Sequence, residues 1–246
     1  MIIPAKQKGE QHATAGPPAL GAGTAEESAN ATIVHEAAAH VTSRVIATAM
    51  ARVVVSPETT VCPPDGFLPP RLDNTPPELQ VQARWVTWVA EGGPGEKPRK
   101  VPYNVTLLNS RASSTDSETW GTFAQAEAAY SEGGRSGVGI VLNGDGLVGI
   151  DIDHCVTNGV IDPSALALLS ALGAKYVEFS PSVTGLRAFG YSDGLAVGCK
   201  GKYNGLDVEL YSTGRYLTVT GASISHEPIS RLKGFKQACK PHPCRS

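Results

Sequence analysis

The sequence predicts an α+β protein with a mixed sheet, because strands and two helices are interleaved without the regular alternation of a doubly wound fold. The chain has 246 residues, 41% of them hydrophobic, which is enough for an independently folded core. Its 27 glycines and 18 prolines indicate many turns and some disorder.

The composition divides the chain into three regions. Residues 1–77 are predicted to be a disordered, low-complexity tail with a possible short helix over 33–55 and a proline-rich linker after it. An ordered domain is expected over 78–222. Residues 223–246 are a basic C-terminal tail, in which the segment from Arg231 onward holds five Lys/Arg and no acid.

Periodicity and turn residues predict the elements of the ordered domain. Residues 84–89 alternate as a strand whose two tryptophans enter the core. A helix is expected over 116–130, and a second one after Asp162 and Pro163, which suit the N-cap and the first helical position. The turn 143–146 predicts a hairpin that joins strands 138–142 and 147–153. Further strands are expected over 176–180, 186–190, 206–212 and 216–220, with a basic loop over 200–205.

Two of these strands carry acidic residues on one face. Side chains at i and i+2 of a strand point the same way, so Asp151 and Asp153 lie side by side while the isoleucines next to them enter the core. On the later strand Asp207 and Glu209 share a face in the same way. Neighbouring carboxylates repel unless a cation lies among them, and oxygen ligands suit Mg²⁺ or Mn²⁺. We therefore expect a divalent-metal site if the two strands are neighbours.

A turn of small residues follows strand 176–180. Ser182, Thr184 and the backbone N–H groups of 183–185 form a turn of the kind that binds phosphate oxygens. Arg187 leaves this turn on a strand, where its guanidinium could bind the same phosphates. Metal-binding carboxylates beside a phosphate-binding turn suit phosphoryl or nucleotidyl transfer.

Nucleic-acid binding would have to use local basic segments, because the formal net charge is −2. Lys97, Arg99 and Lys100 form the densest such segment of the ordered domain, and prolines keep it extended. Lys200 and Lys202 form a second basic segment. An ordinary solvated loop is the alternative for both segments.

Eight stretches, taken together in their order, resemble the primase–polymerase domain of the archaeo-eukaryotic primase superfamily. More narrowly, they resemble the N-terminal bifunctional primase/polymerase domain of phage and plasmid replication proteins. The resemblance covers residues 78–222. The stretches are RWVTW at 84–88, KPRKVPYN at 97–104, DSETW at 116–120, GVGIVL at 137–142, GIDIDHC at 149–155, EFSPSVTGLR at 178–187, VELY at 208–211 and RYLTVTG at 215–221.

The resemblance implies an RRM-like catalytic half, an N-terminal α/β half, and two-metal nucleotidyl transfer. Asp151, Asp153 and Glu209 would be the catalytic and metal-binding residues for Mg²⁺ or Mn²⁺, with Asp207 as a substitute for Glu209. The basic segments that contain Lys97, Arg99, Lys100, Lys200 and Lys202 would contact the template DNA.

The implied nucleotide-binding residues are Ser182, Thr184 and Arg187. The chain departs from the family pattern at two of the positions around this turn. Arg187 stands where the family usually has a phosphate-binding histidine, and Val183 stands where its turn usually has glycine. An arginine is still able to bind a triphosphate, whereas the valine narrows the backbone conformations available.

The implied partners are a single-stranded DNA template, nucleoside triphosphates and a separate replicative helicase, without a membrane. The sequence contains no apolar run of membrane-spanning length and no signal-peptide layout, which favours the cytoplasm of a bacterial or phage-infected cell. Five cysteines without a CxxC pair favour a reduced protein over a disulfide framework.

Other functions remain open from the sequence. The domain could be an inactive relative that binds nucleic acid or a replication origin, or a metal-dependent nuclease. Cys239, His242 and Cys244 could hold zinc, although a fourth ligand is not evident. A zinc-protease motif is not met, because His35 and His40 are five residues apart on the predicted helix instead of four.

Overall fold

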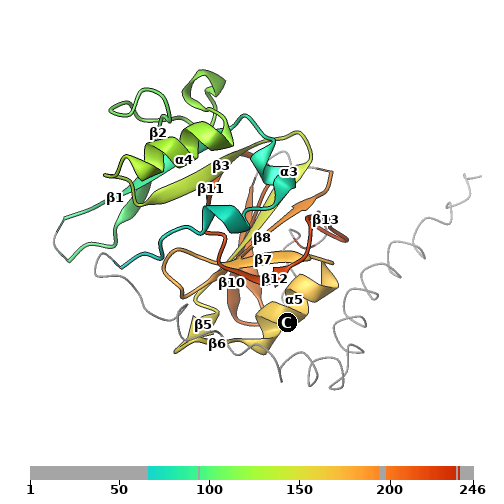
Figure 1. The fold of residues 1–246 in the computed structure, drawn as a ribbon. Helices are drawn as coiled ribbons and strands as arrows, with labels where there is room; N and C mark the ends of the chain where they lie inside the picture. Colours follow the sequence, from blue (N-terminus) through green and yellow to red (C-terminus); the bar gives the residue numbers. More distant parts are fainter. Residues whose placement is uncertain (1–65, 94, 194–197, 237, 239–246) are drawn as a thin grey trace, which may run out of the picture.

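The fold contains two main β-sheets, each with one helix packed against it (Figure 1). The structure is a computed structural model, and it describes residues 66–93, 95–193, 198–236 and 238. The first sheet has the strand order β11-β3-β1-β2. Its strands are β1 (Trp85–Glu91), β2 (Arg99–Tyr103), β3 (Gly137–Asn143) and β11 (Thr213–Val219), all antiparallel to their neighbours.

The second sheet has the strand order β12-β7-β8-β4-β10-β9, and β13 pairs in parallel with β8. Its members are β4 (Leu147–Asp153), β7 (Tyr176–Phe179), β8 (Leu186–Tyr191), β9 (Cys199–Tyr203), β10 (Leu206–Tyr211), β12 (Ser223–His226) and β13 (Ser230–Arg231). The short strands β5 (Val156–Thr157) and β6 (Val160–Ile161) pair separately. The predicted α+β class is confirmed, with two sheets in place of one.

The helices are α3 (Pro77–Gln80), α4 (Phe123–Ser131) and α5 (Pro163–Ala171), with single 3-10 turns at η2 (Leu72–Asn74) and η3 (Ser117–Thr119). As predicted, Asp162 caps α5 by accepting from the N–H of Ser164, and Pro163 begins the helix. The first predicted helix starts late, at Phe123, because Thr122 and Gln125 form a capping box there.

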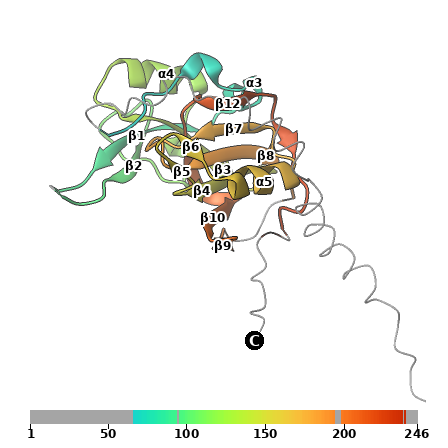
Figure 2. The ribbon, with the colours of Figure 1, turned by 90° about the horizontal axis from the view of Figure 1, so that it is seen from below.

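Two hydrophobic clusters organise these layers. One lies between α5 and the second sheet and includes Ile150 and Ile152 of β4. The other joins α4, the first sheet and the opposite face of the second sheet, and it contains the buried Trp85. Figure 2 shows α5 in front of the second sheet, with β1 and β2 extending to one side. Trp88 is buried as well, so the prediction that both tryptophans enter the core is confirmed.

The predicted hairpin over 138–153 is wrong, because β3 and β4 belong to different sheets. β3 pairs with β1 and β11, whereas β4 pairs with β8 and β10. Arg84 holds the turn between them, since its Nη1 bonds Asn143 and lies 2.7 Å from Asp145 Oδ2. The turn therefore carries the chain from one sheet to the other. The basic loop predicted over 200–205 is also wrong, because residues 199–203 form β9 at the sheet edge.

The packed domain extends beyond both predicted bounds. Leu68 is buried, and its N–H donates to the carbonyl oxygen of Pro181 at 2.7 Å. After residue 222, β12 and β13 join the second sheet and Phe235 is buried. The possible helix over 33–55 and the Cys239, His242 and Cys244 group lie outside the described residues.

Two further expectations concern the cell compartment. No described helix has the length and apolarity needed to cross a membrane. Cys155 is free and buried, but Cys199 is disulfide-bonded, so the prediction that a reduced protein is favoured over a disulfide framework is wrong at that residue.

Candidate active site

The acidic strands β4 and β10 are antiparallel neighbours, as the metal-site prediction required. Their register sets Glu209 opposite Asp151 and Asp207 opposite Asp153. Asp151 and Asp153 lie on the face of β4 opposite the isoleucines that enter the core, as the two-residue period predicts. Four carboxylates therefore share one face of the second sheet.

One row of charged side chains runs across this face. The strand registers align Glu178 on β7, Arg187 on β8, Asp151 on β4, Glu209 on β10 and Lys200 on β9. Cross-strand partners point to the same side of an antiparallel sheet, so each of these five side chains lies next to the one on the adjacent strand. The two acids in the middle of the row are thus flanked by one cation on each side.

Arg187 is buried and links the two sheets. Its Nη1 donates to the carbonyl oxygen of Thr218 on β11 at 2.8 Å and also to the Thr218 hydroxyl. Its Nη2 lies 2.8 Å from Asp151 Oδ2, with side-chain exposures of 5% for Arg187 and 15% for Asp151. Burial alone would lower the pKa of Arg187, but the charge of Asp151 raises it above its ordinary value. Arg187 therefore stays charged and orients the Asp151 carboxylate.

Behind Arg187, Glu178 is fully buried and accepts several hydrogen bonds. The Tyr176 hydroxyl donates to its Oε2 at 2.7 Å, and the N–H groups of Thr220 and Gly221 donate at 3.0 and 2.9 Å. Burial raises the pKa of Glu178 even though these bonds and Arg187 oppose the shift. Glu178 thus joins the end of β7 to the loop after β11.

Glu209 is the better placed of the two acids on β10. Its side chain is 16% exposed, and its carboxylate accepts from Lys200 and from the Tyr211 hydroxyl. Burial opposes the change, but these two hydrogen bonds lower the pKa of Glu209. Asp207 is 52% exposed and pairs with Lys202 at 2.6 Å at the outer edge of the sheet.

The crowding of the acids affects the pKa of Asp153. Burial raises its pKa, and the charges of Asp151 and Glu209 raise it further. Lys97 on the approach to β2 and His154 act in the opposite direction. The three predicted catalytic carboxylates therefore lie within electrostatic reach of one another.

The donor chemistry of this patch fits Mg²⁺ or Mn²⁺, because it offers carboxylate oxygens that repel one another. Among the residues that the structure describes, however, no group of three or more His, Cys, Asp or Glu side chains is placed to hold a metal ion. Asp151 faces Arg187 and Glu209 faces Lys200, so each acid is directed at a basic neighbour. Metal binding by Glu209 would require its carboxylate and the Lys200 ammonium to separate.

The predicted phosphate-binding turn lies directly beside Asp153. A Cβ added at Gly185 would be 2.6 Å from the carbonyl oxygen of Ile152 and 3.5 Å from the Cα of Asp153, so only glycine permits this approach. The hydroxyls of Ser182 and Thr184 are 2.9 Å apart, and Thr184 is exposed. The turn and the acidic pair therefore meet at one end of β4.

Val183 at the tip of this turn has φ of +59°, in the left-handed region that valine rarely adopts. The family pattern has glycine there, and the backbone conformation explains why glycine suits the position. Val183 packs partly against the core around α5, which offsets some of the conformational cost.

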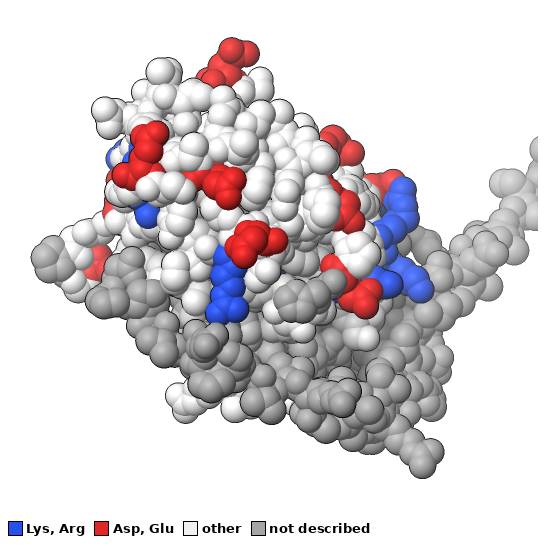
Figure 3. Space-filling view, viewed as in Figure 1, with Lys and Arg blue, Asp and Glu red and all other residues white. Residues whose placement is uncertain are grey.

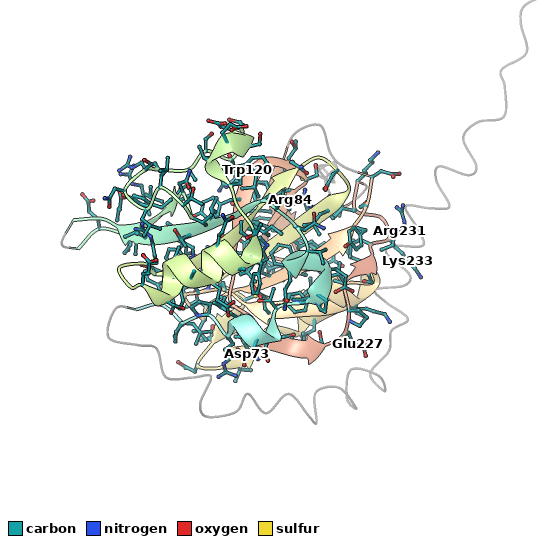
Figure 4. All side chains as sticks on the ribbon, turned by 45° about the horizontal axis from the view of Figure 1, so that its top comes forward. Asp73, Arg84, Trp120, Glu227, Arg231 and Lys233 are labelled. Atoms are coloured by element: carbon teal, nitrogen blue, oxygen red, sulfur yellow. The ribbon has the colours of Figure 1, made fainter. Side chains whose placement is uncertain are left out.

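The predicted DNA-binding residues lie in two places. Lys200 and Lys202 extend from β9 and are paired with Glu209 and Asp207. Lys97 and Arg99 are exposed, whereas Lys100 on β2 is half-buried near Asp151 and Asp153. On the face in Figure 3 the described acidic and basic side chains are interspersed. Figure 4 shows Arg231 and Lys233 of the predicted basic tail together at one edge of the molecule.

Sequence reasoning missed Glu178 and Thr218. An acid in the otherwise apolar strand 176–179 is a signal that a buried partner exists. No local signal marks Thr218, because its bond to Arg187 joins residues that are 31 apart in the sequence.

Comparison with known proteins supports the resemblance inferred from the motifs. The chain is 35% identical over 157 residues to a protein of Nitratiruptor phage NrS-1 named DNA primase-polymerase. The match covers 58% of this chain and 20% of that protein, so the chain spans about a fifth of the relative's length. No protein-family model matches the chain. The predicted resemblance is therefore confirmed, and more than half of this chain is related to a phage DNA primase-polymerase.

Proposed function

We propose that this domain is a DNA-directed primase/polymerase that transfers nucleotides in phage- or plasmid-type DNA replication. The pairing of Glu209 with Asp151 across β4 and β10 carries the proposal, because it completes a three-carboxylate patch with Asp153. The phosphate-binding turn beside Asp153 and the similarity to a phage primase-polymerase support the same function.

In this proposal Asp151, Asp153 and Glu209 would hold Mg²⁺ or Mn²⁺. Bound there, divalent ions would lower the pKa of an attacking 3′-hydroxyl and neutralise charge on the leaving pyrophosphate. Arg187 keeps the Asp151 carboxylate oriented, since the guanidinium is fixed by Thr218 on the other sheet. Lys200 neutralises Glu209 and would release it on metal binding.

The turn 182–185 would receive the triphosphate. The hydroxyls of Ser182 and Thr184 would donate hydrogen bonds to phosphate oxygens, and Thr184 is accessible because it is exposed. Arg187 was expected to bind the same phosphates, but both of its terminal nitrogens already have partners. We therefore assign Arg187 to the Asp151 carboxylate, with its charge acting on the phosphates from beneath the site.

The proposed partners are single-stranded DNA and nucleoside triphosphates. Lys97, Arg99, Lys200 and Lys202 are exposed and would contact the template backbone, where their effect should weaken with salt. The matched part is about a fifth of the related phage protein. We propose a separate replicative helicase as a further partner.

The test is primer synthesis on single-stranded DNA with labelled nucleotides and Mn²⁺ or Mg²⁺. The wild-type protein should make template-dependent products, and Asp151→Ala with Asp153→Ala should abolish them. Products that persist in this double variant would refute the assignment of the catalytic site. Thermal unfolding of the double variant provides the folding control.

The same assay separates the two alternative functions. DNA degradation without added nucleotides that requires Asp151 and Asp153 would indicate a nuclease. Tight binding of single-stranded DNA without synthesis, unchanged in the double variant, would indicate an inactive nucleic-acid-binding module. The proposed enzyme predicts neither result.

A further inference from the structure

Lys100 and Arg99 are neighbours on β2 but occupy opposite faces of the first sheet. The register of β1 and β2 sets Lys100 opposite Ala90 and Arg99 opposite Glu91. Successive strand residues point to opposite faces, so Lys100 and Arg99 point to opposite sides of the first sheet. Lys100 is half-buried, whereas Arg99 is exposed.

The face that Lys100 occupies also contacts the charged row of the second sheet, through Thr218. In the same registers Ala90 shares its face with Trp88, and Thr218 of this face bonds Arg187 on the second sheet. The Tyr216 hydroxyl donates to the carbonyl oxygen of Lys100, which fixes the backbone of β2 at this point. Gly139 leaves room for the Tyr216 ring to reach across the sheet, because a Cβ at residue 139 would be only 2.8 Å from Cδ2 of that ring.

The surroundings of the Lys100 ammonium combine aromatic and charged groups. Its Nζ is 5.7 Å from the centroid of the Phe67 ring, which packs edge-on against Trp88. The charges that act on it are those of Arg187, Asp151, Asp153 and Lys97. Lys100, on the first sheet, is therefore within electrostatic reach of Arg187 and of the acidic pair on the second sheet.

Lys100 also lacks a carboxylate partner. The described ion pairs join Arg187 to Asp151 and Lys200 to Glu209, and Lys100 takes part in none of those found among the described residues. A half-buried ammonium without a paired anion is costly, and an anionic ligand would compensate for it. An ammonium carries three donors and binds phosphate as a point charge.

We propose that Lys100 binds the phosphate groups of the incoming nucleoside triphosphate and is a substrate-binding residue of the site, not a template contact. This inference rests on the proposed function and adds a nucleotide contact from the first sheet. The nucleotide would then lie between β2 on one side and the acidic strands on the other. Both sheets would be needed to bind it.

The experiment measures the affinity of the full chain for dGTP by calorimetry, with Mg²⁺ and without DNA. Lys100→Ala should weaken dGTP binding at least about 10-fold, the effect expected for a lost charged hydrogen bond. Lys100→Arg should recover most of the affinity. Repeating the titration in EDTA should preserve the loss, because the contact is with phosphate and not with metal.

Two other variants serve as controls. Arg99→Ala should keep dGTP affinity within about 2-fold and weaken single-stranded DNA binding by the loss of one phosphate contact. Arg111→Ala removes an exposed cation that pairs with Glu91 near the same strand, and should change neither affinity. All variants should unfold at the temperature of the wild-type protein.

The outcomes distinguish this inference from the proposed function. If Lys100→Ala binds dGTP as tightly as wild type but loses DNA affinity, the assignment of Lys100 is refuted. Absence of dGTP binding to the wild-type protein would refute it as well. If dGTP binding depends on Lys100 but no polymer is formed, Lys100 is confirmed as a phosphate ligand and the polymerase function fails.

Discussion

Replacing Arg187 by methionine tests the charged row across the second sheet. The substitution keeps much of the side-chain volume but removes the contact with Asp151 Oδ2 at 2.8 Å and the bonds to Thr218. It leaves the Asp151 carboxylate mostly buried, at 15% exposure, without its cation. Breaking a buried pair in this way costs about 3–5 kcal/mol.

We expect the lower end of that range, about 3 kcal/mol, because the Asp151 carboxylate can partly regain water. For a domain of this size, that loss lowers the Tm by about 6–12 °C. The measurement is thermal unfolding by circular dichroism at low and high salt. A buried pair is screened little, so the loss should be similar at both.

The matched control is Lys202→Met on the same sheet. Lys202 and Asp207 are 2.6 Å apart, but their side chains are 67% and 52% exposed, so the Tm should not change measurably. Adding Asp151→Asn to Arg187→Met should recover part of the lost Tm, because it removes the buried carboxylate charge that has no cation in the single variant. Equal Tm values for Arg187→Met and Lys202→Met would refute the reasoning.

Three further predictions concern other parts of the site and core. Burial and then the charges of Asp151 and Glu209 raise the pKa of Asp153. The folded state therefore holds the Asp153 carboxyl proton more tightly than the unfolded state, and stability falls as the pH rises from the unfolded-state pKa through the folded-state pKa of Asp153. Asp153→Asn should therefore raise the Tm at neutral pH, but not at acid pH, while abolishing synthesis; a Tm at neutral pH no higher than that of the wild type would contradict this. Burial raises the pKa of Cys155 to about 12, so mass spectrometry should find Cys155 unlabelled by iodoacetamide until the protein is unfolded. A Cβ at Gly149 would lie 2.1 Å from Leu217 Cδ1, so Gly149→Ala should lower the free energy of unfolding by about 1–3 kcal/mol in urea, whereas Gly201→Ala, with open space around it, should have no such effect.

The local parts of the site could be predicted from the sequence. The two-residue period of strand 147–153 determines that Asp151 and Asp153 share a face, and the cap formed by Asp162 depends only on adjacent residues. The assumption that β4 and β10 are neighbours is confirmed by their register. These features follow from short-range geometry.

The arrangement of the two sheets could not be predicted in this way. A Gly-rich turn between apolar strands fits a hairpin, and it fits equally well a crossing between two sheets. The choice is made by partners far along the chain, since β11 pairs with β3 and β8 pairs with β4. Arg84 then stabilises the crossing by binding Asn143 and Asp145.

The roles of the basic residues also depend on tertiary contacts. Arg187 follows a predicted phosphate-binding turn in the sequence, but its terminal nitrogens donate hydrogen bonds to Thr218 and Asp151. Lys100 lies next to Arg99, yet the pleat sends the two side chains to opposite faces. The pleat was predictable, but which face meets the acidic patch depends on how the sheets pack.

The central claim is that Asp151, Asp153 and Glu209 form one divalent-metal centre for nucleotidyl transfer. The most direct measurement is electron paramagnetic resonance of free Mn²⁺ during titration of the protein, with and without dGTP. Wild-type protein should remove Mn²⁺ from solution more strongly when dGTP is present, and the variant with all three residues changed to Asn or Gln should lose this binding while its fold, checked by circular dichroism, is kept. Equal Mn²⁺ binding by the wild-type protein and this variant would contradict the account.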